Sequence, residues 1–446
     1  IKIYDTMTRS LRDFVPLTEN VVNMYVCGPT VYNYIHIGNA RSAVAFDTIR
    51  RYFEYCGYTV NYISNFTDVD DKIIKAANEA GISTKELSDK FIAAFMEDTG
   101  QLGIKPATQN PRVINYMDEI IAFVSTLVDK GFAYVSEGDV YFRVAKSNNY
   151  AKLANKTLED LEIGASGRTD AETERKENPL DFALWKAAKE GEVSWDSPWG
   201  PGRPGWHIEC SVMATEILGD TIDIHGGGAD LEFPHHTNEI AQSEAKTGKT
   251  FANYWMHNGF VNVDNEKMSK SLGNFVTVHD MLQTVDGQVL RFFLATQQYR
   301  KPINFTEKAI HDAEVNLKYL KNTHSLPLTE QVNQAELQTY LDTFQEAMDD
   351  DFNTANGVTV LFDMAKWINS GNYDQTVKDA FEKMLQVFGI VFEEEVLDED
   401  IEKLIEERQA ARANKDFATA DRIRDELAAQ GIKLLDTKEG VRWTRD

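Results

Sequence analysis

The sequence predicts an α/β protein: a doubly wound parallel sheet that carries an insertion, followed by an α-helical bundle and a small C-terminal α/β domain. Three observations lead to this fold class. Short apolar runs at residues 21–27 and 59–64 flank a helical pattern, which makes a βαβ unit. The apolar spacing is mostly helical from residue 306 to about 389. Residues 400–430 predict a helix or a helix pair ahead of a short β-like tail.

The first βαβ unit contains one long helix and one loop that could bind a ligand. The helical pattern begins near Asn39 and stops at Gly57, and its apolar face holds Phe46, Ile49, Phe53 and Cys56. This face predicts that Cys56 is buried in the core and unreactive. The loop at 28–38 follows the carboxyl end of the first strand, where ligands bind in doubly wound sheets.

The remaining elements follow in chain order. We expect three helices, at residues 70–81, 84–100 and 111–130. A hairpin that turns at Glu137 and Gly138 is expected at residues 133–144. Residues 151–205 are polar and rich in Gly, Pro and Trp, so we expect an insertion there. We then expect a strand that glycines 226–228 interrupt, a helix and a second strand, at 221–225, 234–247 and 260–263.

Composition excludes several classes of protein. The 446 residues are 42% hydrophobic and 26% charged, which is ordinary for a globular chain and excludes global disorder. No apolar run approaches the ~20 residues of a membrane span, and the first twenty residues contain no signal-like apolar segment. Three cysteines are too few for a disulfide framework and fit a reducing compartment, so we expect a cytoplasmic protein without a membrane partner.

The net charge is uneven along the chain. Its sum is 46 − 71 = −25, which taken alone argues against a polyanionic partner. The C-terminal segment 401–446, however, holds ten basic and ten acidic residues and sums to zero. The stretch 393–400 carries six acids and no base, and it predicts a linker. This local difference weakens the argument from net charge.

The tetrapeptide His36-Ile-Gly-Asn39 lies between a strand end and a helix start. A helix N-terminus offers free N–H groups and a positive dipole end, which suits a phosphate. An imidazole beside it can donate to a phosphate oxygen, and Gly38 allows a close backbone approach. The alternative is a loop histidine followed by a turn glycine.

The pentapeptide Lys267-Met-Ser-Lys270-Ser lies in a polar loop. Two lysines three residues apart on a mobile loop could neutralise charge on a transferring phosphate chain. The alternative is a pair of solvated surface lysines.

The pair His235 and Glu239 lies four residues apart on the expected helix and so shares one face. Imidazole and carboxylate at that spacing can bind zinc. The alternative is a surface or capping pair, since spacing alone adds no further ligand and His236 is expected to point elsewhere. The run Ile222-Asp-Ile-His225 before three glycines is either a nucleotide-contacting loop that includes Gly226 or a tight turn.

Taken together, these signals resemble the paired signatures of class I aminoacyl-tRNA synthetases. The chain is most similar to the cysteinyl-tRNA synthetase family, and the resemblance covers its whole length. The stretches that carry it are YVCGPTVYNYIHIGNARS, NFTDVDDKI, PGWHIECSVM, DIHGGGADLEFPHHTNEIAQSEA, EKMSKSLGNF and, near the C-terminus, ERQAARANKDFATADRIRDELAAQGI. Two positions depart from the family pattern: Phe66 replaces an aliphatic residue, and Thr237 replaces a glutamate.

The resemblance implies one zinc ion and a cysteine pocket. The family's two cysteines, histidine and glutamate that hold zinc correspond to Cys27, Cys210, His235 and Glu239. Pocket positions that contact the amino acid correspond to Thr67, Trp206 and His225. Cysteine and serine are nearly the same size, so shape alone would separate them poorly. A zinc with an open position binds thiolate much more strongly than a neutral hydroxyl, so no editing domain is expected.

The resemblance also implies the ATP site and the partners. The expected ATP-binding positions are His36, Gly38, Asn39, Gly226, Lys267 and Lys270. Of these, His36, Asn39 and the two lysines match the family's phosphate-binding motifs and are the expected catalytic residues. The implied partners are ATP with Mg²⁺, L-cysteine and tRNA(Cys), acting on a monomer. Trp443 either stacks on an anticodon base or belongs to a small core.

The implied domains are a Rossmann-type catalytic domain with a connective insertion, a lysine-loop region, a helical tRNA-binding bundle and an anticodon-binding domain. Their expected bounds are 1–110 with 206–264, then 111–205, 265–305, 306–392 and 401–446.

The nearest rival function is a ligase that joins cysteine to an amino-sugar, but such relatives lack the C-terminal region. A paralogue that has lost catalysis is a second rival, and it does not fit two intact phosphate motifs. An unrelated adenylyltransferase is a third, and it does not explain the cysteines.

Overall fold

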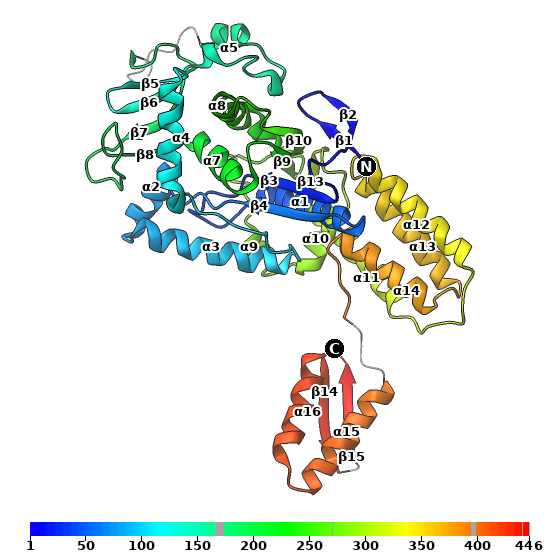
Figure 1. Cartoon of the computed structure of the whole chain (residues 1–446). Coiled ribbons are helices and arrows are strands. Elements are labelled where there is room, and N and C mark those ends of the chain that lie inside the picture. The colour runs from blue at the N-terminus through cyan, green and yellow to red at the C-terminus, as the bar shows by residue number, and fades with distance from the viewer. Residues whose placement is uncertain (166–173, 270, 394–397, 439, 446) are drawn as a thin grey trace. The chain divides into compact units, whose positions relative to one another are not determined.

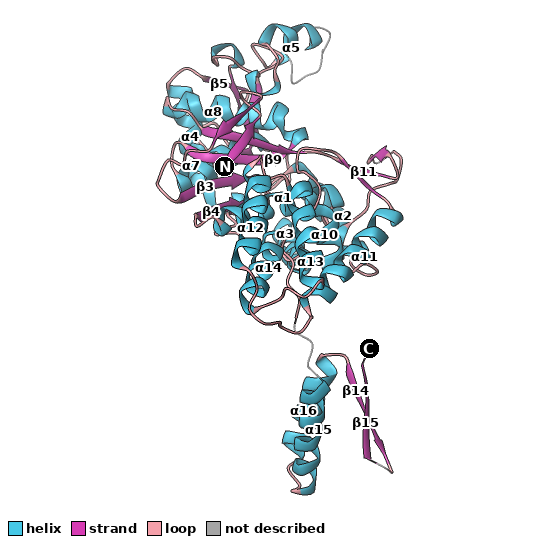
Figure 2. Ribbon diagram, turned by 90° about the vertical axis from the view of Figure 1, so that its right-hand side faces the viewer, coloured by secondary structure: helices cyan, strands magenta, loops and turns pink. Residues whose placement is uncertain are grey.

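The structure is a computed structural model that describes residues 1–165, 174–269, 271–393, 398–438 and 440–445. The chain forms two compact units. The first comprises residues 1–320 and 328–390, and the second comprises 321–327 and 391–446 (Figures 1 and 2). None of the helices in the described ranges is both long and apolar enough to cross a membrane.

The first unit is built on a parallel sheet of four strands in the order β10-β9-β3-β4. Their bounds are Val21–Val26 for β3, Thr59–Ser64 for β4, Ile222–Gly228 for β9 and Ala252–Asn258 for β10. Helix α1 (Ile37–Tyr55) connects β3 to β4, and α8 (Thr237–Thr247) connects β9 to β10. Helix α7 (Trp206–Leu218) packs against α8 and β9. The predicted doubly wound parallel sheet is confirmed. A short hairpin of β1 (Lys2–Asp5) and β2 (Ser10–Asp13) contacts β10.

The prediction that Cys56 is buried was wrong. Helix α1 ends at Tyr55, and Cys56 is its exposed C-cap with φ −82° and ψ 0°. Gly57 then turns the chain with φ 96°. The helical periodicity that places Cys56 beside Phe53 therefore does not extend to it, because the helix stops one residue earlier.

The prediction that glycines 226–228 interrupt their strand was also wrong, because β9 runs through all three. A Cβ atom on Gly226 would lie 2.3 Å from the Phe46 ring, and one on Gly227 would lie 2.9 Å from Leu231. These glycines are therefore required for close packing of the strand against its neighbours, which the sequence pattern alone presents as a turn.

The expected helix at 234–247 begins later than predicted. An irregular turn, η5 (Glu232–His236), precedes α8, and Phe233 within it is extended with φ −143° and ψ 133°. The expectation that His236 points elsewhere was wrong for this reason. Its Nε2 lies 3.6 Å from the Cys27 sulfur, on the same side as His235.

The chain between β4 and β9 forms helices and a second sheet. Besides α7, the helical elements in the described part of this stretch are α2 (Asp71–Ala80), α3 (Thr84–Gln101), η1 (Val113–Tyr116), α4 (Met117–Asp129), η2 (Val144–Lys146), η3 (Lys152–Ala154) and α5 (Leu158–Ala165). An antiparallel sheet contains β5 (Ala133–Ser136), β6 (Asp139–Phe142), β7 (Phe182–Ala187) and β8 (Gly202–Pro204). The hairpin turns where predicted, since Glu137 and Gly138 have φ values of 53° and 85°.

After β10 the first unit contains a three-stranded sheet and a group of helices. The strands are β11 (Val261–Val263), β12 (Glu266–Lys267) and β13 (Ile303–Phe305). The helices are α9 (Val278–Met281), α10 (Gly287–Ala295), α11 (Glu307–His324, of which residues 307–320 belong to this unit), α12 (Gln334–Asp349), α13 (Thr354–Asn369) and α14 (Gln375–Val387). The buried Arg291 of α10 donates to Asp47 of α1 at 2.7 Å and to the Phe388 carbonyl at 2.9 Å. This ion pair joins α1 to the helical part of the unit.

The second unit pairs two helices with a hairpin, as predicted for the C-terminal segment. These elements are α15 (Asp398–Ala413), α16 (Phe417–Ala429), β14 (Ile432–Thr437) and β15 (Gly440–Arg445). Their own core contains Ile401, Ile405, Ile423, Leu427 and Ile432. Trp443 packs against this core, and its indole N–H donates to Glu402 at 2.8 Å. Part of the expected acidic linker, residues 394–397, lies outside the described residues.

Candidate active site

A cavity of about 770 Å³ lies at the carboxyl ends of the parallel strands. Two groups of side chains line it. One group includes Cys27, Cys210 and His235, and the other includes His36 and Lys267. The sequence motifs for metal binding and for phosphate binding therefore meet in one cavity, although they come from distant parts of the chain.

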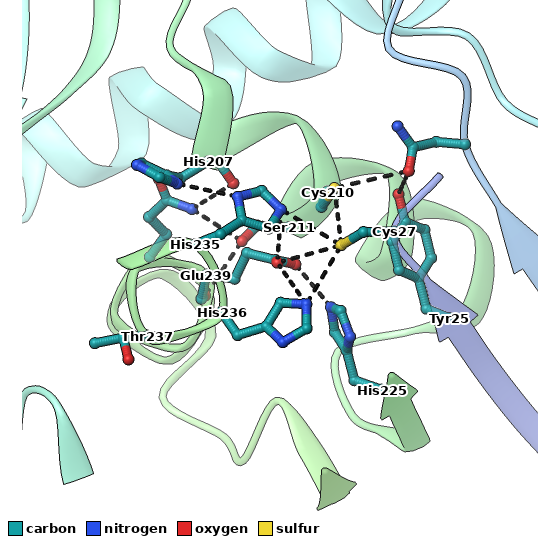
Figure 3. Close-up of polar contacts among 12 residues, drawn as sticks. Tyr25, Cys27, His207, Cys210, Ser211, His225, His235, His236, Thr237 and Glu239 are labelled. Atoms are coloured by element: carbon teal, nitrogen blue, oxygen red, sulfur yellow. Dashed lines mark hydrogen bonds and ion pairs between the residues drawn. The ribbon is translucent and has the colours of Figure 1, made fainter. Parts of the chain in front are cut away.

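The four residues that the resemblance implies as zinc ligands converge on one point (Figure 3). The Cys27 sulfur lies 3.4 Å from the Cys210 sulfur, 3.4 Å from His235 Nε2 and 3.6 Å from Glu239 Oε2. His235 Nε2 lies 3.2 Å from Glu239 Oε2. All four ligand atoms lie within 4.8 Å of one another.

These spacings fit the edges of a zinc tetrahedron. Bonds of about 2.3 Å to sulfur and about 2.0 Å to nitrogen or oxygen place tetrahedral ligand atoms roughly 3.3–3.8 Å apart. The observed distances of 3.2–3.6 Å lie at or close to that range. Two thiols, one imidazole and one carboxylate are also donors that zinc accepts. The residues present therefore fit the metal.

A second set of four side chains shares two of these ligands. It replaces Cys210 and His235 with His225 and His236. In that set His225 Nε2 is only 2.8 Å from Glu239 Oε1, which is a direct hydrogen bond and too short for a tetrahedral edge. The first set is therefore the better metal site, with His225 as the group that holds its carboxylate.

Histidines outside the ligand set hold the ligands in place. His225 bonds to Glu239, and His207 Nδ1 lies 3.0 Å from His235 Nδ1. Ligand orientation by such outer contacts is general in metal sites. Sequence reasoning missed His207. Its position three residues before Cys210, on the same face of α7, was the available signal.

Burial acts on the ionisation of the cluster. Burial raises the pKa of the Cys27 thiol, and a hydrogen bond to Cys210 raises it further. Burial also raises the pKa of Glu239 and lowers the pKa of His235. The protein alone therefore favours uncharged side chains here, and a bound cation is what would make a thiolate and a carboxylate favourable at this depth.

His36 is the N-cap of α1. Its Nδ1 accepts from the Asn39 backbone N–H at 3.2 Å, while the Asn39 side chain accepts from the His36 backbone at 3.1 Å. Because Nδ1 is an acceptor, the ring proton resides on Nε2, which is left as a donor. Burial lowers the pKa of His36, so the ring is neutral at neutral pH. A Cβ atom on Gly38 would lie 2.9 Å from this ring, which explains the glycine.

The lysine loop approaches the same helix end. The Ile37 backbone N–H donates to the Val276 carbonyl, and the Val278 N–H donates to the Ile35 carbonyl, both at 3.0 Å. Lys267 lies on β12, with its ammonium 5.3 Å from the Phe260 ring centroid. Lys270 lies outside the described residues.

The other expected site residues occupy different positions. Thr67 is buried and lines the cavity, and Trp206 is half exposed and stacks on His235 with ring centroids 4.4 Å apart. Gly226 and His225 are buried in β9, and neither is among the described residues that line the cavity. Lys72 does line it, although the sequence pattern gave it no role.

Proteins of known name match the whole chain. Over all 446 residues and the full length of each relative, the chain is 95% identical to a cysteine–tRNA ligase of Streptococcus thermophilus, 84% to one of Streptococcus pyogenes and 82% to one of Streptococcus agalactiae. The chain belongs to the cysteine–tRNA ligase family. Three family models match successive parts of the chain. They are a class I (C) tRNA synthetase catalytic domain at 13–315, a DALR domain at 343–393 and a cysteinyl-tRNA ligase anticodon-binding domain at 394–443.

Solved structures share the fold of this ligase-family chain. Methionyl-tRNA synthetase of Mycobacterium tuberculosis, in complex with methionyl-adenylate, aligns with a TM-score of 0.61 at 15% identity, over 82% of this chain and 89% of that one. A LeuRS–tRNA complex of Agrobacterium radiobacter aligns with a TM-score of 0.61 at 11% identity, over 84% of each chain. At these identities the likeness concerns the fold alone. The predicted class I architecture is confirmed by the match of the catalytic-domain family model to residues 13–315.

Proposed function

We propose that the chain activates L-cysteine with ATP and transfers it to the 3′-terminal adenosine of tRNA(Cys). The observation that carries this proposal is the single cavity that both the thiol-rich cluster and the helix-capping His36 line. Family membership over the full length supports the same activity. An amino-sugar ligase is not favoured, because the match extends through the C-terminal anticodon-binding part.

The cluster supplies selectivity in this proposal. Cys27, Cys210, His235 and Glu239 would hold zinc. When bound, the zinc would take the substrate thiolate as an additional fifth ligand and would disfavour a neutral hydroxyl. Discrimination of about 10⁴ against serine needs about 5.5 kcal/mol, which is within reach of a lost metal–sulfur bond. Trp206 and Thr67 would shape the rest of the cysteine pocket, and His225 would act on it through its hydrogen bond to Glu239.

The part of the cavity that His36 and Lys267 line would bind the ATP phosphates and accelerate the reaction. The cysteine carboxylate attacks the α-phosphorus of ATP, which arrives as its Mg²⁺ complex, and pyrophosphate leaves. The His36 Nε2–H donates to phosphate oxygens beside the N-terminus of α1, where Gly38 and Asn39 leave backbone room. Lys267 and Lys270 would neutralise charge on the leaving group. Gly226 is not among the described residues that line the cavity, so it would affect ATP binding only through the packing of β9 against Phe46. Positioning and electrostatics carry most of the acceleration.

The adenylate then passes its aminoacyl group to the tRNA, and class I membership implies the 2′-hydroxyl as acceptor. Activation would take place in the catalytic domain at 1–110 and 206–264, with the insertion at 111–205 and the lysine-loop region at 265–305. The helical bundle at 306–392 and the domain at 401–446 would bind the tRNA through Arg and Lys side chains. Free thiols in the ligand set require a reducing compartment, which supports a cytoplasmic location.

The deciding experiment charges total tRNA with labelled cysteine, with excess serine as competitor. We expect one tRNA species to carry cysteine, with serine leaving the signal unchanged. Zinc-loaded, folded protein that charges no tRNA would contradict the proposal and favour the amino-sugar ligase.

Two variants test the residue roles. Cys210→Ser should lose zinc and weaken cysteine binding, and full metal content in this variant would exclude Cys210 as a ligand. Lys270→Ala should slow cysteine activation, and activity within about threefold of the unmodified protein would exclude its role.

A further inference from the structure

Asn65, the residue after β4, connects three segments of the cysteine pocket. It is fully buried. Its Oδ1 accepts from the Tyr25 hydroxyl and the Gly28 backbone N–H, each at 3.0 Å, and its Nδ2 donates to Thr67 Oγ1 at 3.0 Å. The Cys210 sulfur lies 3.8 Å from the same Oδ1. One carboxamide therefore contacts a pocket wall and a zinc-ligand candidate together.

The orientation of this carboxamide is fixed by its partners. A backbone N–H can only donate, so the Asn65 atom that faces Gly28 must be the oxygen. The amide nitrogen must then face Thr67. The two loops also approach very closely, because a Cβ atom on Gly28 would lie 1.7 Å from the Asn65 carbonyl oxygen. The glycine thus holds the Asn65 backbone where its side chain can make these bonds.

The orientation of the Asn65 carboxamide determines the direction in which the Thr67 hydroxyl can donate its hydrogen. The hydroxyl has one hydrogen, and it accepts from Asn65, so its hydrogen cannot point toward Asn65. It is instead directed to the buried Glu209 side chain, whose pKa this hydrogen bond lowers against the larger effect of burial. The oxygen of Thr67 itself belongs to a residue that lines the cavity. An acceptor in place of the amide nitrogen would draw the hydrogen back toward position 65.

We propose that Asn65 is a positioning residue for cysteine binding, which acts by fixing the direction of the Thr67 hydroxyl. This inference rests on the proposed function. Asn65→Asp keeps the side-chain shape and the acceptor for Gly28, but it presents a second oxygen to Thr67 and reverses that hydrogen bond. The effect should therefore fall on the affinity for cysteine rather than on ATP.

The test measures pyrophosphate exchange without tRNA, together with zinc per chain. For Asn65→Asp we expect the KM for cysteine to rise by about tenfold, the KM for ATP to stay within about twofold, and one zinc to be retained. Thr67→Val should raise the KM for cysteine as well. Adding Asn65→Asp to Thr67→Val should change it by less than about twofold more, because residues that act through one another are not additive.

Asn61→Asp is the matched control. Asn61 lies on β4 and bonds to Asn23 at 2.9 Å, away from the cavity, so the same chemical change there should leave the KM for cysteine within about twofold.

Each other outcome overturns the inference. An unchanged KM for cysteine excludes the role. If Asn65→Asp raises the KM for cysteine just as much when Thr67 is already valine, the rise comes from the new charge and not from Thr67. If Asn65→Asp loses its zinc, Asn65 supports the metal site instead. If Asn65→Asp does not fold, Asn65→Ser is measured against the same limits. Unmodified, zinc-loaded protein without cysteine-dependent exchange would instead contradict the proposed function, which separates the two failures.

Discussion

His225 offers a direct test of how the metal site is supported. Its Nε2 donates to Glu239 Oε1 at 2.8 Å, and both side chains are fully buried. Its Nδ1 is buried and finds no partner in the described part of the chain. Replacing the ring by phenylalanine thus removes one hydrogen bond to a candidate ligand and leaves no other group newly unsatisfied at that position.

The size of the effect follows from this single contact. Loss of an outer-shell partner typically lowers metal affinity 10- to 100-fold, which is about 1.4–2.7 kcal/mol. The His225 ring also stacks on Trp255 with centroids 4.5 Å apart, and phenylalanine preserves that packing. His225→Gln is the complementary variant, because it keeps a donor near the Nε2 position and loses the ring.

The assay is competition for zinc against a chelator of known affinity, with thermal unfolding measured in parallel. We expect His225→Phe to lose zinc affinity by about 10- to 100-fold and His225→Gln to stay much closer to the unmodified protein. We expect His225→Phe to unfold at nearly the same temperature as the unmodified protein and His225→Gln to unfold at a lower temperature, because only phenylalanine keeps the ring that stacks on Trp255. Zinc affinity of His225→Phe within about threefold of the unmodified protein would refute the assignment of His225 to the support of Glu239.

Three further predictions concern packing, pH and domain roles. Gly226→Ala should destabilise the protein by about 1–3 kcal/mol through a clash with Phe46, and adding Phe46→Leu should restore part of this stability. A raised KM for ATP without any loss of stability would contradict the packing role and favour a role in nucleotide binding. Burial opposes ionisation of Asp47, but Arg291 and Arg51 hold its pKa below the usual value. Its stabilising effect is therefore present above the unfolded pKa of about 3.9 and is lost as the pH falls toward the folded pKa. Urea midpoints should show Asp47→Asn losing about 3–5 kcal/mol at pH 7 and a smaller difference near pH 3, and a pH-independent difference would contradict the charge argument. Deletion of 401–446, which has its own core, should spare pyrophosphate exchange and impair tRNA charging, and equal loss of both would refute this division.

The sequence pattern was enough to predict the strands and turns that neighbouring residues define by themselves. Strand β4 has the predicted bounds, and β3 ends one residue earlier than predicted, because continuous apolar runs bounded by turn signals define buried parallel strands. The Glu137–Gly138 turn was equally predictable from its residues. The errors at Cys56 and Gly226 arose where tertiary packing decides the outcome, at a helix end and in a strand whose glycines admit a neighbouring ring.

The site was only partly predictable from its residues. The spacing of His235 and Glu239 suggested a shared face, and these atoms do lie 3.2 Å apart. Spacing could not add Cys27 and Cys210, which are 183 residues apart in sequence and meet only in the folded chain. Those two came from the family resemblance. Asn65 was missed because it makes no motif with a neighbour in sequence, whereas His207 was missed although it lies three residues before Cys210 on the same face of α7.

The topology explains why such distant residues form one site. Cys27 follows β3, and Glu239 follows β9, which is the neighbour of β3 in the sheet. Parallel neighbours end at the same edge, so these two ligands meet without any special feature of the intervening chain. Cys210 arrives differently, on α7, after the chain has left β4 and built the second sheet. The insertion therefore has a consequence for the site: its return through β8 sets where α7 begins. A change in the packing of that second sheet would displace Cys210 and Trp206 while leaving His36 in place. Substitutions that disturb the packing of the second sheet should for this reason weaken cysteine binding more than ATP binding.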